Sequence, residues 1–154
     1  IPEPALEPSS LAEVKMVGCP VGDENDMLSL SMVNHQLRAR GYPLNLGAPG
    51  RLSSEIVDWV DAEEPAIVCV VSVAPAELTQ TRFICKRLRG RFPDLKLVAA
   101  RFGAGDDLPA DKEALLKAGA DHVCGTVTET AKQMIHMLQL ATLQKPEVEV
   151  ALAH

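Results

Sequence analysis

The segment GCPVGDENDML, which follows the first apolar run, gathers the side chains best suited to chemistry. It holds a thiol at Cys19 and three carboxylates at Asp23, Glu24 and Asp26. Carboxylate oxygens can hold a cation such as Mg²⁺, or they can cap the positive end of a following helix. A cysteine just ahead of a helix can also have a lowered thiol pKa. The segment therefore predicts a capped helix start or, alternatively, a small-ligand or cation site.

Two chemistries are opposed by single residues. A phosphatase loop of the low-molecular-weight type needs an arginine six residues after its cysteine, and Asn25 stands there. A receiver-type phosphorylation site needs an aspartate at the end of the third strand, but the apolar run IVCVVSV ends in Ser72 and Val73. We therefore expect Cys19 to be an inert thiol and the domain to have no enzymatic activity.

A second group of charged residues recurs at helical spacing between residues 77 and 91. Arg82, Lys86 and Arg89 fall on one side of the expected helix, so they predict an exposed basic stripe. Such a stripe can be a solvated face, or it can bind an acidic partner, a second copy of the domain or lipid headgroups. We take these three residues as the candidate partner-binding residues.

Five strand–helix units must position these side chains. Helices are expected over residues 27–40, 54–61, 77–91, 112–117 and 129–143, each after a short apolar run. Runs such as IVCVVSV are continuously apolar, as parallel strands covered on both faces require. The pattern predicts an α/β fold with a doubly wound, open, five-stranded parallel sheet in the order 2-1-3-4-5, as in flavodoxin-like folds. Ligands bind such sheets at the carboxyl ends of strands one and three.

The composition limits the domain organisation and the partners. The 154 residues predict a single α/β domain over 13–143, between a proline- and glutamate-rich linker at 1–12 and a tail at 144–154 that includes a short extended piece. A net charge of -6 opposes binding to nucleic acid or to anionic lipid. Four widely spaced cysteines and the lack of a long apolar stretch favour a reduced, cytoplasmic setting.

The two loops after strands one and three resemble those of the cobalamin-binding domain family. That family carries Asp-x-His-x-x-Gly after strand one, with a histidine on cobalt, and a serine at the end of strand three beside the nucleotide tail. By this resemblance Asp23 matches the aspartate and Ser72 the serine, while Asn25 replaces the histidine and Leu28 the glycine. Alanines also replace the paired glycines that end strand four. An amide is a poor cobalt ligand, so the resemblance implies a degenerate site lined by Asp23, Asn25, Asp26 and Ser72, with no cofactor.

A second resemblance rests on GCPVGDENDMLSLSM, AIVCVVSVAPAEL, TRFICKRLRGRFPDLKLV and GADHV. These strings are similar to the soluble C-terminal domain of proteobacterial members of the autoinducer-2 exporter family of permease-like proteins. The resemblance implies a non-enzymatic regulatory or interaction domain, cytoplasmic and tethered to the inner membrane. Its partner would be the parent transmembrane domain or another copy of itself. The alternative is a small-molecule or cofactor binder, including one that holds a corrin with the corrin's own base in place, and a small enzyme using Cys19 or the acidic loop ranks behind both.

Overall fold

The computed structural model describes residues 14–153 of the chain, with side chains through residue 141. The elements follow one another as β1 (Met16–Pro20), α2 (Glu24–Ala39), β2 (Asn45–Leu46), α3 (Ser53–Glu63), β3 (Ile67–Val73), α4 (Leu78–Arg91), β4 (Lys96–Phe102), a 3-10 turn η1 (Gly105–Asp107), α5 (Leu108–Lys117), β5 (His122–Cys124) and α6 (Val127–Ala153). The strands form one parallel sheet in the order β2-β1-β3-β4-β5. The doubly wound, flavodoxin-like architecture predicted from the sequence is confirmed.

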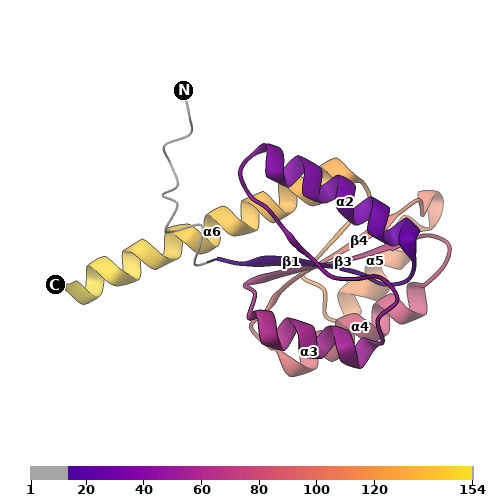
Figure 1. Cartoon of the computed structure of the whole chain (residues 1–154), viewed down its shortest axis with the longest axis horizontal. Coiled ribbons are helices and arrows are strands. Elements are labelled where there is room, and N and C mark those ends of the chain that lie inside the picture. Colours follow the sequence, from indigo (N-terminus) through magenta and orange to yellow (C-terminus); the bar gives the residue numbers. More distant parts are fainter. Residues whose placement is uncertain (1–13, 154) are drawn as a thin grey trace.

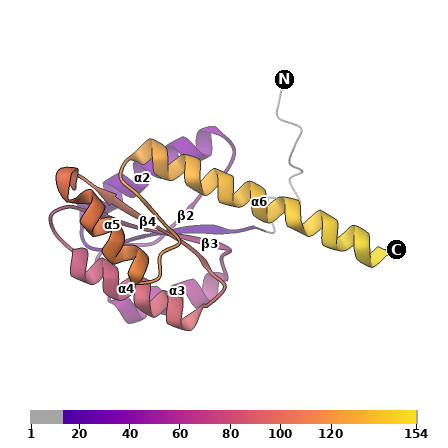
Figure 2. The same cartoon turned by 180° about the vertical axis from the view of Figure 1, so that it is seen from behind.

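Helices cover both faces of the sheet. Helices α2 and α6 lie on one face and α3, α4 and α5 on the other (Figures 1 and 2). Successive residues of β3 point to opposite faces, so Cys69 joins the core under α2 and α6 while Val68 and Val70 join the core under the other three helices. Burial on both sides explains why this strand is continuously apolar.

Two helices end at glycines with a positive φ, one in the string RARGY and one in the string KAGAD. After α2, Gly41 has φ 86 and its N–H donates to the Arg38 carbonyl at 2.9 Å. After α5, Gly119 has φ 121, and a Cβ there would lie 2.7 Å from the Cβ of Arg89. Position 119 therefore requires glycine for its backbone conformation and for a close side-chain approach.

The last helix is longer than the sequence predicts. Its buried face includes Met134, Met137 and Leu138, which pack in the core. Beyond the sheet the helix continues to Ala153 (Figure 1), so the expected extended piece within 144–154 is wrong. The expected linker at 1–12 lies outside the described residues. Within the part of the chain that is described, no helix is both long enough and apolar enough to cross a membrane.

Candidate functional site at the carboxyl edge of the sheet

The loop between β1 and α2 begins the site. Asp23 is the N-cap of α2, and its Oδ1 accepts a hydrogen bond from the Asn25 N–H at 3.0 Å. Both side chains are exposed. Asp23 therefore has the capping role that the sequence offers as one alternative, and Asn25 lies at the outer rim of the loop.

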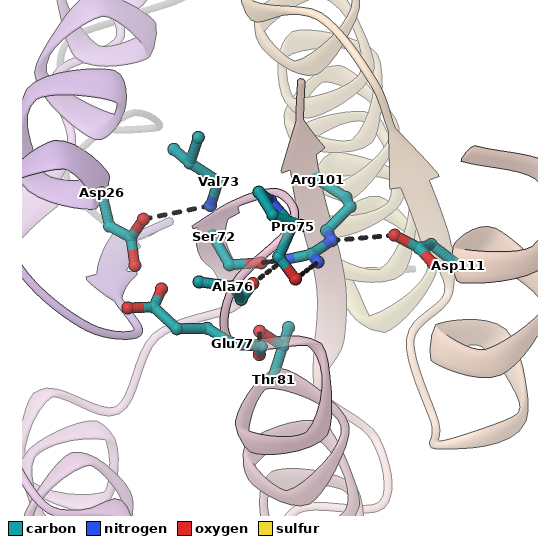
Figure 3. Close-up of polar contacts among 9 residues, drawn as sticks. All are labelled: Asp26, Ser72, Val73, Pro75, Ala76, Glu77, Thr81, Arg101 and Asp111. Atoms are coloured by element: carbon teal, nitrogen blue, oxygen red, sulfur yellow. Dashed lines mark hydrogen bonds and ion pairs between the residues drawn. The ribbon is translucent and has the colours of Figure 1, made fainter. Parts of the chain in front are cut away.

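Asp26 differs from its two neighbours because it is buried. Its Oδ2 accepts a hydrogen bond from the Gly22 N–H at 2.8 Å, and its Oδ1 accepts one from the Val73 N–H at 3.0 Å (Figure 3). One carboxylate thus joins the first turn of α2 to the end of β3. The side chain holds together the two loops between which a flavodoxin-like sheet binds its ligands.

A third carboxyl group reaches this point from the loop between β3 and α4. Ligand oxygens of Asp23, Asp26 and Glu77 lie within 4.8 Å of one another. Glu77 has a positive φ of 68, and its carbonyl accepts bonds from the N–H and Oγ1 of Thr81 in the first turn of α4. Its carboxylate lies against Gly22, where any Cβ would collide with it. Any larger residue at position 22 would therefore force the Glu77 carboxylate to move from this position.

The surroundings of Glu77 favour its protonated form. The pKa of its carboxyl is raised from 4.5 to about 7, first by a hydrogen bond shared with Asp26, then by burial and by the negative charges of Asp26 and Asp23, while Arg101 lowers it. The buried Oε2 has no hydrogen-bond partner in the described part of the chain. The three carboxylates could accept a proton, or a hard cation such as Mg²⁺.

The polar contacts at the carboxyl ends of β3 and β4 centre on a residue that the sequence reasoning missed. Arg101, the second-last residue of strand β4, is only 1% exposed. Its Nε donates to Asp111 Oδ2 and its Nη1 to Ser72 Oγ, each at 3.0 Å. Further bonds go to the carbonyl oxygens of Ala76 at 2.6 Å and Pro75 at 3.2 Å (Figure 3). A charged residue inside the apolar run LVAARF was the available signal.

The expected site residues are therefore only partly brought together. Asp23, Asp26 and the rim residue Asn25 lie on one loop, with Asp26 bonded to the end of β3. Ser72 is fully buried and is bonded to Arg101. The structure adds Glu77 and Arg101 to the residues that the sequence indicates.

The basic stripe needs one correction. Arg82 and Lys86 are exposed on α4, as expected, but Arg89 is half-buried. Its guanidinium donates to the carbonyl oxygens of Gly119, Pro93 and Leu95 and to Asp121, at 2.7–2.9 Å. Arg89 holds the loops around β4 and β5, so it does not belong to a freely accessible stripe.

Cys19 does not have the character of a nucleophile. It is buried at the end of β1, and burial raises the pKa of its thiol to about 12, although the charge of Arg51 lowers it. A thiol with that pKa is protonated at neutral pH, and the thiolate is the reactive form. The structure therefore supports the inert thiol expected from the sequence.

The larger described groove lies away from this site. It has a volume of about 570 Å³ and lies at the opposite, amino edge of the sheet, between the ends of α3 and α4. Its lining includes Val60, Pro65, Phe92 and Leu95. The carboxyl-edge residues are thus described by their polar contacts with one another.

No protein-family model matches the chain, and no curated protein sequence matches it. Its fold is similar to that of a cobalamin-binding protein from Desulfitobacterium hafniense, with a TM-score of 0.65 and 19% identity over 80% of this chain and 58% of that one. It is also similar to a CheY-like protein, TadZ, from Pseudomonas aeruginosa, with a TM-score of 0.60 and 16% identity over 81% and 97% of the two chains.

A response regulator from Thermotoga maritima is similar as well, with a TM-score of 0.56 and 18% identity over 82% of this chain and 98% of that one. These identities establish a shared fold and nothing more specific. The chain is a flavodoxin-like domain whose structural neighbours include cobalamin-binding and CheY-like proteins, and it spans 58% of the length of the cobalamin-binding protein.

Proposed function

We propose that the chain is a non-enzymatic regulatory or interaction domain with a degenerate cobalamin-type site, and that in its parent protein it is the cytoplasmic domain of a permease-like membrane transporter. The observation that carries the first part is the buried Arg101, which donates a hydrogen bond to the buried Ser72 hydroxyl. The serine that the cobalamin-domain resemblance places beside a nucleotide tail is thereby bonded to the chain's own guanidinium.

Two residues in the outer part of the site also support the proposal. Asn25 stands where the cobalamin-binding pattern has its cobalt-ligating histidine, and its amide is a poor metal ligand compared with a neutral imidazole. The exposed Leu28 stands at the position of the pattern's glycine. A corrin bound here would have no histidine ligand from the protein, and its nucleotide tail would meet a serine that is already bonded to Arg101.

Adding cobalamin to the purified chain tests this proposal. We expect no change in the corrin absorbance spectrum and no corrin retained after gel filtration. An Asn25→His variant serves as a control for the role of the histidine ligand, and we expect it to remain colourless because Ser72 is still bonded to Arg101. A red wild-type complex would overturn the proposal in favour of the base-on corrin binder.

The proposed attachment to a transporter is supported by the resemblance to the exporter family over four strings of the sequence. It is tested separately, in the gene that encodes the chain. We expect the coding region upstream of Ile1 to encode several hydrophobic spans and the full-length protein to fractionate with the inner membrane. An upstream region without any such span would overturn the attachment and leave the corrin result unaffected.

A further inference from the structure

Helices α3 and α4 lie side by side over one face of the sheet (Figures 1 and 2). Together they present charges of both signs. We call their outer surface the α3–α4 face. Its exposed acids on α3 are Glu55, Asp58 and Asp61, and its exposed bases on α4 are Arg82, Lys86, Arg87 and Arg91.

Some of these charges hold the two helices together. Arg91 forms an ion pair with Asp61 at 3.2 Å, and Arg87 donates to the Ser53 hydroxyl at 3.3 Å. By contrast, Asp58, Arg82 and Lys86 have no ion pair or side-chain hydrogen bond with any residue that the structure describes. These three charges remain available to a partner.

Apolar side chains accompany the charges. Phe83 is 50% exposed on α4, and the guanidinium of Arg87 lies 5.7 Å from its ring centroid. Leu52, next to Ser53 at the start of α3, is 67% exposed. An exposed aromatic residue flanked by arginine and surrounded by charges is typical of a protein–protein interface, in which aromatic residues and arginine are enriched.

We propose that the α3–α4 face is the surface on which two copies of this chain associate. In a two-fold dimer each patch meets its own copy, so Asp58 of one protomer can face Arg82 and Lys86 of its partner, and the reverse contact forms as well. A lipid surface or a nucleic acid would need a face of one sign, and both would be repelled by the net charge of -6. The inference deepens the proposed interaction role and rests on it, but it needs neither the transporter attachment nor the corrin exclusion.

Sedimentation velocity of the purified chain tests the proposal, with charge-reversed variants mixed in pairs. We expect the wild type to dimerise, more weakly at high salt. Arg82→Glu with Lys86→Glu should weaken the dimer roughly tenfold or more, because two attractive contacts become repulsive in each half of the interface. Asp58→Lys should weaken it for the same reason. A one-to-one mixture of the two variants should restore the dimer, since every contact is then again between opposite charges.

The matched control is Lys112→Glu with Lys132→Glu, which reverses two exposed lysines on α5 and α6 and should leave the dimer intact. A wild type that stays monomeric at all concentrations would overturn the proposal, as would variants that dimerise normally or a mixture that stays monomeric. Binding of the monomer to vesicles of anionic phospholipid through Arg82 and Lys86 would also overturn it, in favour of a lipid surface. None of these outcomes alters the corrin titration, so the two proposals fail separately.

Discussion

Replacing Glu77 by glutamine should remove a pH dependence of stability that the wild type has. The Glu77 carboxyl has a pKa raised from 4.5 to about 7, mainly through its shared hydrogen bond with Asp26. A raised folded-state pKa means that the folded protein holds the proton more tightly than the unfolded chain does. The resulting stabilisation is complete below about pH 4.5 and is lost as the pH rises through about 7.

The size of the effect follows from the two pKa values. The interval from 4.5 to about 7 corresponds to about 3 kcal/mol, at about 1.36 kcal/mol for each pH unit. Because the Glu77 side chain is only half-buried, solvent screening reduces the expected loss to about 1–2 kcal/mol. Glutamine keeps a hydrogen-bond donor for Asp26 but cannot ionise. The Glu77→Gln variant should therefore not lose this stability as the pH rises.

The assay is urea unfolding of wild type and Glu77→Gln at about pH 5 and about pH 8, an interval that spans the expected titration. The variant should gain about 1–2 kcal/mol on the wild type between the two pH values. Contributions that the wild type and the variant share cancel in this difference. Glu64→Gln is the matched control, since Glu64 also has a positive φ, of 50, but lies outside the carboxylate cluster. An equal difference at both pH values would refute the assigned proton on Glu77.

Two further predictions concern the contacts around the site. Replacing Arg101 by methionine should destabilise the chain by about 3–5 kcal/mol in urea unfolding, because Asp111 is left without its buried partner. The double change Arg101→Met with Asp111→Leu should recover most of that loss, because it removes both charges. Equal destabilisation of both variants would contradict this. Gly22→Ala should cost about 1–3 kcal/mol through its collision with the Glu77 carboxylate, and adding Glu77→Ala should remove most of the cost. Additive effects in that double-mutant cycle would contradict the predicted contact.

The fold could be predicted because its signals are local. Continuous apolar runs and helical spacing are visible in short windows of the sequence, and right-handed crossovers leave few ways to order the strands. The glycines at 41 and 119 could be recognised for the same reason, since a left-handed helix end needs only a few neighbouring residues to be identified.

The site was only half predictable, because its contacts join residues far apart in the sequence. Asp23 and Asp26 could be recognised because they lie on one loop. The approach of Glu77 to them depends on a turn much later in the sequence, and on a glycine at position 22 that leaves room for the Glu77 carboxylate. Arg89 shows the same limit. Helical spacing predicted an exposed position beside Arg82, whereas the Arg89 side chain packs against Gly119, which follows α5.

The contacts of Arg101 support the proposal that the cobalamin-type site is degenerate. A site that binds a polar molecule must leave hydrogen-bonding groups unpaired until the ligand arrives, and buried unpaired groups cost stability. Here the hydroxyl of Ser72 and the carbonyls of Pro75 and Ala76 are already paired with one guanidinium, whose charge is balanced by Asp111. A ligand at this point would have to displace a buried ion pair, and the displaced guanidinium would have to be solvated or paired again. The contacts therefore favour a structural role for Arg101, and the proposed interactions would then use the acidic rim and the helical faces.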